Sequence, residues 1–201
     1  MGRPRTTPDA AVLQASSRVL ARFGPSRFTL ADIAVEAGLA PATLIQRFGS
    51  KRGLLLALAQ AAAESADACF LRVRAGHRSP VKALFAAFDE MAAMAATPEA
   101  LANSLAFLQM DLADPEFRRW TLMNARATTT GFRALLEDAI RAGELRRCDA
   151  LGLARLIQAA AHGSMVTWAV YQEGPVADWL RRDMQLLLAP YRLSRRDRQK
   201  V

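Results

Sequence analysis

The sequence predicts an all-α protein, on three observations. Hydrophobic residues make up 52% of the 201 residues and aromatic residues only 7%, and Ala and Leu dominate the apolar fraction, which favours helices over strands. Apolar residues recur at helical spacing within successive segments. A proline or glycine separates each segment from the next. A chain of this length holds one core, or one core and a small second domain.

The protein is strongly basic, and its positive charge is concentrated near the N-terminus. The net charge is +8 at pH 7, and 24 of the 27 basic residues are arginines. So uniform a preference for arginine indicates genome composition, and the position of the charge is therefore more informative than its amount. Residues 1–52 hold eight basic groups and three acidic ones, which makes this segment the place where a polyanion such as nucleic acid would bind.

The sequence lacks the patterns of enzymes, metal sites and exported proteins. Cys69 and Cys148 are isolated and His77 and His162 are the only histidines, so no disulfide framework, metal site or nucleophile–base pair is indicated. The N-terminus has no apolar signal stretch, and no run of about 18 uncharged apolar residues occurs. We expect a cytoplasmic protein that is not an enzyme, needs no metal or other cofactor, and does not bind a membrane.

The first helix is predicted over residues 9–23. Thr7, Pro8 and Asp9 supply a cap, a helix-initiating proline and an early acid, and Gly24-Pro25 ends the helix. Its buried face is predicted to hold Val12, Val19, Leu20 and Phe23.

A tight glycine turn is predicted to join the next two helices. Thr29 opens the second helix and forms a capping-box pair with Asp32, and Gly38 ends it in the left-handed conformation of a tight turn. The third helix begins at Pro41 and runs to Phe48. It turns Leu44 and Phe48 inward and leaves outward Thr43, Gln46 and Arg47. Residues 29–48 therefore match a helix-turn-helix, whose second helix enters the DNA major groove.

The rest of the chain is predicted to be a series of longer helices. Ser50 caps a fourth helix that runs from Lys51 to about Ala75. Later breaks are predicted at Gly76 to Pro80, Thr97-Pro98, Asp114-Pro115, Gly143 to Asp149 and Gly174-Pro175.

The run TLADIAVEAGLAPATLIQRFGSKRGLL, residues 29–55, resembles the DNA-binding signature of TetR-family repressors. The resemblance extends over residues 6–66, and beyond them the chain is similar to the family only in length and helical punctuation. It rests on Ala37-Gly38, Thr43-Leu44, Phe48 and Ser50-Lys51 at these spacings.

The resemblance implies an all-α homodimer with its DNA-contacting residues on the helix-turn-helix. At matching positions it puts Thr29, Thr43 and Lys51 against phosphates, and it puts nearest the bases Pro41, Ala42, Gln46 and Arg47. The chemistry agrees, because Gln pairs with adenine and Arg with guanine or phosphate.

Two positions depart from the family pattern. Ile45 stands where a tyrosine is usual, and Arg47 where histidine or tyrosine is common. Ile45 either contacts a thymine methyl group or packs against the fourth helix, and the residues alone leave both interpretations open. Ahead of the first helix, Arg3 and Arg5 form a short basic arm that can reach into a narrow minor groove.

The larger C-terminal part is predicted to bind a small effector and to dimerise. Residues 80–145 are rich in Met and Phe, most of which form the core, and thioether chains also suit an adaptable apolar pocket. Candidate effector contacts are Phe88, Met91, Phe107, Met110, Trp120, Met123 and Trp168. The last two amphipathic helices resemble the dimer-forming pair of the family, with candidate interface residues Ala160, Ser164, Tyr171, Leu180 and Leu187.

These features predict a DNA-binding domain over residues 1–50, an effector-binding and dimerisation domain over 51–193, and a basic tail over 194–201. By family resemblance we expect a ligand-responsive repressor that leaves a near-palindromic operator when a small, largely apolar molecule binds. The alternative, motivated by Ile45, is an apolar-ligand-binding helical dimer whose degenerate helix-turn-helix no longer binds DNA specifically.

Overall fold

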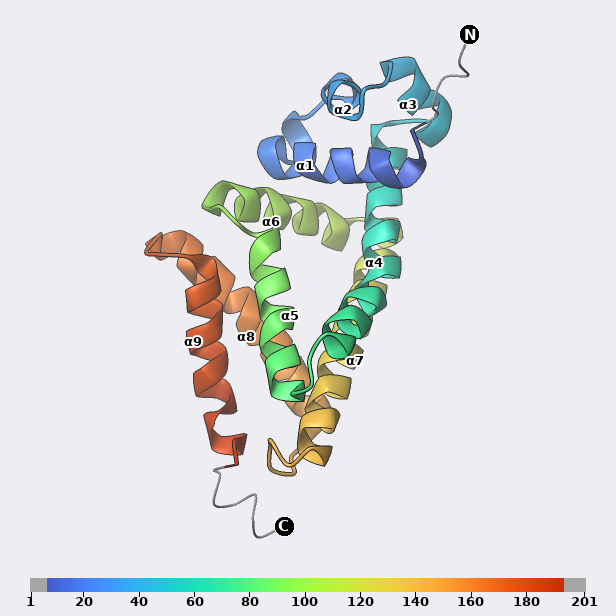
Figure 1. Cartoon of the computed structure of the whole chain (residues 1–201). Coiled ribbons are helices and arrows are strands. Elements are labelled where there is room, and N and C mark those ends of the chain that lie inside the picture. The colour runs from blue at the N-terminus through green and yellow to red at the C-terminus, as the bar shows by residue number, and fades with distance from the viewer. Residues whose placement is uncertain (1–6, 194–201) are drawn as a thin grey trace. The chain divides into compact units, whose positions relative to one another are not determined.

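A computed structural model of the chain describes residues 7–193 and is helical throughout (Figure 1). Within these residues the β-structure is limited to one isolated bridge, between Leu145 and Arg192. The predicted all-α fold is confirmed. The helices are α1 (Asp9–Arg27), α2 (Leu30–Ala37), α3 (Pro41–Phe48), α4 (Lys51–Ala75), α5 (Pro80–Met94), α6 (Pro98–Ala113), α7 (Pro115–Arg141), α8 (Ala150–Tyr171) and α9 (Val176–Leu188), followed by a 3-10 turn, η1 (Ala189–Tyr191).

The helix boundaries follow the proline and glycine punctuation, with one correction at α1. The helix continues to Arg27, and Gly24 interrupts it with a positive φ of 74°. An added Cβ at Gly24 would come within 2.5 Å of Oδ1 of Asn103, whose amide donates a hydrogen bond to the carbonyl of Ala21. The predicted side-chain cap from Thr7 is also wrong, because Pro8 holds the N-cap position and its carbonyl accepts from the amide of Ala11 at 3.0 Å.

The chain forms two compact units that are interleaved in sequence. Among the described residues, the first comprises 7–64 and 102–122, and the second comprises 65–101 and 123–193. This division differs from the predicted boundary after Ser50, because Leu54, Leu55 and Leu58 of α4 are buried in the core of the helix-turn-helix unit. Phe117 of α7 is buried in the same core.

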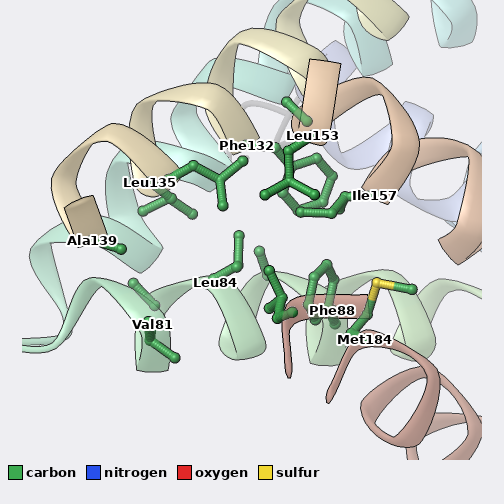
Figure 2. Close-up of a cluster of buried hydrophobic side chains, with 14 of the residues drawn as sticks. Val81, Leu84, Phe88, Phe132, Leu135, Ala139, Leu153, Ile157 and Met184 are labelled. Atoms are coloured by element: carbon green, nitrogen blue, oxygen red, sulfur yellow. The ribbon is translucent and has the colours of Figure 1, made fainter. Parts of the chain in front are cut away.

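The main core of the second unit is built by α4, α5, α7, α8 and α9, and Figure 2 shows a close-up of it. The rings of Phe88 and Phe132 have centroids 5.5 Å apart, and Phe70 meets Phe132 edge-on at 5.0 Å. Phe88 and Phe132 are fully buried and Phe70 is half-buried, and their contact stabilises the fold by packing as well as by removing apolar surface from water. The labelled side chains of Figure 2 converge from α5, α7, α8 and α9: Val81, Leu84, Phe88, Phe132, Leu135, Ala139, Leu153, Ile157 and Met184.

A second cluster in this unit joins α8 and α9 to the end of α5 and the start of α6. Trp168 and Leu180 are buried there, and the indole N–H of Trp168 donates to the carbonyl of Gly174 at 2.9 Å. This hydrogen bond satisfies the polar atom of a buried aromatic residue. It also fixes the turn between α8 and α9.

One described helix, α4, is long and apolar enough to cross a membrane by length and composition. The mean hydropathy of its most apolar 18-residue window is 1.4. The core helix of a water-soluble protein passes the same test. Leu54 and Val73 lie in the hydrophobic cores of the two units, and Glu64 and Asp67 interrupt the apolar run. Packing within the chain therefore accounts for part of the apolar character of α4, since 28% of the apolar window is buried.

Candidate nucleic-acid interface

Helix α2 begins at the predicted capping box. The hydroxyl of Thr29 accepts a hydrogen bond from the amide of Asp32 at 3.2 Å, and the carboxylate of Asp32 accepts one from the amide of Thr29 at 2.7 Å. The hydroxyl of Thr29 also donates to this carboxylate, and these bonds lower the pKa of Asp32. At the other end Gly38 adopts φ 65°, and its amide reaches the carbonyls of Ala34 and Val35. The prediction for α2 is confirmed at both ends.

Helix α3 presents a row of small and polar side chains to solvent. Leu44 is completely buried and anchors the helix. Ile45 is 52% exposed, so its side chain is not enclosed by the fourth helix in the free chain. Thr43 is half-buried, and the exposed members of the outer face besides Ile45 are Pro41, Ala42 and Gln46. A surface of this kind, with little bulk at the first turn of the helix, can approach base edges closely.

Arg47 does not point freely into solvent as predicted. Its Nη1 donates to the carbonyl of Thr7 at 2.6 Å and lies 3.2 Å from Oδ1 of Asp9, and its side chain is only 18% exposed. The helical spacing placed it on the outer face, but the start of α1 covers this edge of α3. The assignment of Arg47 as a base contact is therefore unsupported by its geometry.

Lys51 joins the beginning of α4 to the end of α1. Its Nζ donates to the carbonyl of Phe28 at 2.7 Å, lies 3.5 Å from the carbonyl of Ser26, and sits 4.1 Å from the centroid of the Phe28 ring. These partners lie more than twenty residues away, and no local pattern identified them. Ser50 caps α4 as predicted, because its hydroxyl accepts from the amide of Gly53.

The turn between α6 and α7 belongs to the same unit. Arg52 pairs with Asp114 and with Glu116, each at 2.7 Å, and its guanidinium lies 5.4 Å from the centroid of the buried Phe117 ring. The hydrogen bond to Arg52 is the largest cause of the lowered pKa of Asp114. No sequence pattern identifies this cluster, because Arg52 and its partners are more than sixty positions apart. Arg3 and Arg5, the predicted basic arm, lie outside the described residues.

The seven candidate effector contacts do not come together within either unit. Phe88 is buried in the main core of the second unit, Trp168 is buried in the second cluster, and Met91 packs against both. Met123 is exposed, and the core of the first unit takes up Phe107, Met110 and Trp120. A hollow of about 540 Å³ on the second unit is lined by other residues, Arg133, Glu137, Ile140, Arg141, Arg147, Cys148, Asp149, Ala150 and Leu151.

Two of the candidate dimer contacts need correction. Leu180 has no exposed surface and cannot touch a partner, and Ser164 is buried with its hydroxyl bonded to Asp183 at 2.6 Å. Helical periodicity shows that these two residues lie on an apolar or small-residue face of their helices. It does not show whether that face packs on the protein's own core or on a partner. Ala160 and Leu187 are half-buried against that core, whereas Tyr171 is exposed.

Comparison with known proteins agrees with this geometry. Residues 12–58 match the family model described as "Bacterial regulatory proteins, tetR family". These residues, 47 of the 201, are similar to the N-terminal part of TetR-family proteins and include the helix-turn-helix. The match includes α2, α3 and the first third of α4, which make up most of the first unit's core. The family model describes regulatory proteins, which agrees with the helix-turn-helix predicted for this part of the chain.

The whole TetR-type fold recurs in solved structures. A TetR transcription regulator from Haloarcula marismortui superimposes with a TM-score of 0.73 at 19% identity, over 92% of this chain and 97% of the other. FadR from Bacillus subtilis, solved in complex with stearoyl-CoA, superimposes with a TM-score of 0.67 at 17% identity, over 90% of this chain and 98% of FadR. SmeT, the repressor of a Stenotrophomonas maltophilia multidrug efflux pump, superimposes with a TM-score of 0.66 at 20% identity, over 94% of this chain and 92% of SmeT. No curated protein matches the sequence.

Proposed function

We propose that this chain is a homodimeric, cytoplasmic repressor that occupies a near-palindromic DNA operator and leaves it when a small, largely apolar effector binds. The observation that carries the proposal is the outer face of α3. Ile45 and Gln46 are exposed there, whereas the residue before them, Leu44, is fully buried and anchors the helix. A rigidly anchored helix with an unoccupied polar and apolar face is what major-groove recognition requires.

The DNA contacts proposed from the sequence remain Thr29, Pro41, Ala42, Thr43, Ile45, Gln46 and Lys51. Gln46 has the amide that pairs with adenine, and Ile45 supplies a methyl surface for thymine. The net charge of residues 1–52, with eight basic groups and three acidic ones, supports binding to phosphates. Lys51 keeps an N–H donor available for phosphate beside its bond to Phe28, because an ammonium group has three.

Dimerisation is supported by an apolar stripe on the outer side of α8. Leu156, Val166 and Val170 are exposed at spacings that place them on one face of the helix, and Val170 is 76% exposed. Ala159 and Gly163 lie between them and permit close approach of a second helix. A two-fold dimer doubles a short recognition site into a near-palindrome. We place the interface on this face, with Tyr171 at its edge.

Effector binding is proposed in the second unit, whose core is made of Leu, Phe and Met side chains. FadR, a structural neighbour, is described in complex with stearoyl-CoA, which supports an effector with a large apolar part. Three helices, α4, α6 and α7, continue from one unit into the other. A change in their packing on effector binding would therefore reach the unit that reads DNA.

Selection from a pool of randomised duplexes tests the DNA-binding part of the proposal. The pool carries about 30 random base pairs, enough for two half-sites one helical turn apart. We expect the full-length protein to enrich a near-palindromic sequence. Retention of duplexes without any enriched sequence would instead support a helical apolar-ligand binder with a degenerate helix-turn-helix.

Thermal-shift measurements test the effector part. Acyl-CoA thioesters, fatty acids and uncharged apolar compounds are added to the dimer, and a compound that raises the Tm is then added to the protein–DNA complex. We expect the same compound to release the selected duplex. A compound that raises the Tm but leaves the complex intact would argue against an effector-released repressor.

A further inference from the structure

The contact between Arg47 and Thr7 joins the recognition helix α3 to the start of α1. One guanidinium nitrogen reaches both the carbonyl of Thr7 and the carboxylate of Asp9, at 2.6 and 3.2 Å. These partners are 40 and 38 positions earlier in the sequence. The acceptor at Thr7 is a backbone oxygen, so the contact fixes the path of the chain and not only a side chain.

Thr7 is also the point where the chain leads into its basic arm. Arg5 and Arg3 precede it by two and four residues. A segment that contacts DNA binds more tightly when its attachment point is held in the right place, because less conformational freedom is lost on binding. A fixed Thr7 beside α3 would let the arm and the recognition helix engage neighbouring grooves of one DNA site.

We propose that Arg47 is a positioning residue for DNA binding: it holds the root of the N-terminal arm against the recognition helix and does not read a base. The proposal rests on the proposed function, since it concerns the same DNA site. Arg47 would have to give up a carbonyl and a carboxylate to reach a base, and most of its side chain is already covered. Its neighbour Gln46 is exposed and needs no such rearrangement.

Arg47 has a second effect on the same surface. Asp9 is a largely exposed acid at the beginning of α1, and an unpaired carboxylate there would repel DNA phosphates. The ion pair with Arg47 offsets that charge. Arg47 thus has two effects on DNA binding: it holds Thr7, where the arm begins, and it neutralises the charge of Asp9. Neither effect requires a contact between Arg47 and DNA.

The first test compares base preference. The duplex selection is repeated with Arg47→Ala. A positioning residue predicts the same enriched sequence with lower affinity, about tenfold when the arm is no longer held. A changed base at one position of each half-site would overturn the proposal, because that is the result expected of a base-reading arginine.

The second test is a double-mutant cycle with the arm. The affinity for the selected duplex is measured for the full-length protein, Arg47→Ala, a protein lacking residues 2–5, and the combination. Arg47→Ala should lower affinity strongly in the full-length protein and by a clearly smaller factor once the arm is removed, when only the unpaired charge of Asp9 weakens binding. Equal losses in both backgrounds would overturn the proposal, since Arg47 would then act without the arm.

Arg18→Ala is the matched control for loss of one positive charge. Arg18 lies on α1 and pairs with Glu36 at 2.7 Å, so its removal also breaks an exposed ion pair. It should lower affinity only slightly, and equally with and without the arm. Failure of the full-length protein to enrich any duplex would be a different result: it would count against the proposed function itself, and the positioning role would fall with it.

Discussion

The hydroxyl of Thr121 donates a hydrogen bond to Oδ2 of Asp111 at 2.7 Å, while the other carboxylate oxygen, Oδ1, is buried without a partner among the described residues. Asp111 is only 5% exposed. Burial raises its pKa, and the hydrogen bond from Thr121 opposes this only in part. The first unit thus contains a carboxylate that lowers its stability at neutral pH.

Asp111→Asn should raise the free energy of unfolding at pH 7 by about 1 kcal/mol, because a neutral amide avoids the cost of a buried charge. The native state binds this proton more tightly than the unfolded state, so the carboxylate's unfavourable effect appears as pH rises from about 4 through the raised pKa. The difference between the two proteins should therefore vanish near pH 3. Chemical denaturation at several pH values measures it.

The same change at an exposed acid is the control for Asp111→Asn. Asp67 on α4 is exposed, and Asp67→Asn should leave the unfolding midpoint at pH 7 nearly unchanged. If Asp111→Asn were destabilising at pH 7 and neutral at pH 3, the carboxylate would be a net stabilising group and the argument from burial would be wrong.

Asp114→Ala should lower the Tm more than Glu116→Ala, although both acids pair with Arg52 at 2.7 Å. Asp114 also accepts a hydrogen bond from the amide of Glu116 at the start of α7, so its removal loses a helix cap as well as an exposed ion pair. We expect a loss of about 3–5 °C for Asp114→Ala and under about 1 °C for Glu116→Ala. Asp114→Asn keeps a capping oxygen, so its loss of Tm should lie between those of the two alanine variants. Equal losses of Tm in all three variants would show that Asp114 does not act as a helix cap.

Ile45→Ala should weaken binding to the selected duplex about 3- to 10-fold without changing the Tm, because Ile45 is exposed in the free protein and touches DNA only in the complex. The neighbouring Leu44→Ala should instead cost about 2–5 kcal/mol of stability, since Leu44 is fully buried. Anisotropy titration and thermal denaturation separate the two effects. A lower Tm for Ile45→Ala would indicate packing rather than DNA contact.

Val170→Glu should convert the dimer to a monomer, because it puts a charge on the exposed apolar face of α8, at its most exposed side chain. Leu71 on α4 is also exposed, and Leu71→Glu is the control for adding an acid to an apolar surface site. Sedimentation velocity measures the oligomeric state. A dimer that persists with Val170→Glu, or is lost equally with Leu71→Glu, would place the interface elsewhere.

Gly131→Ala should destabilise the protein, although alanine is normally the better helix residue by about 1 kcal/mol. A Cβ at Gly131 of α7 would overlap the ring of Phe70, and this ring packs edge-on against the adjacent Phe132. Denaturant unfolding should show a loss of about 2 kcal/mol, within the range for overpacked cores. Adding Phe70→Leu to Gly131→Ala should restore part of the lost stability, because the smaller side chain leaves room for the new Cβ. If Gly131→Ala were instead more stable than the original protein, α7 and Phe70 would move apart without cost.

The sequence alone determined the helices and the type of DNA-binding element. Capping residues, prolines and glycines act on the backbone within one helical turn, so the box at Thr29 and Asp32, the turn at Gly38 and the start of α4 at Lys51 could be predicted. The spacing of these signals also carried the family resemblance. The location of the α1 kink at Gly24 was predicted, but not that the helix resumes after it.

Only the tertiary structure decided which helical faces meet. Periodicity predicts that Leu180 or Phe107 is buried, but not whether the burial is in its own chain's core, in an effector pocket or against a partner. The contacts of Arg47 with Thr7 and of Lys51 with Phe28 turned two side chains expected at DNA toward the protein itself. Residues 102–122 joined the DNA-binding unit for the same reason. Such contacts depend on how helices pack across long stretches of chain, and no pattern within a single helix records them.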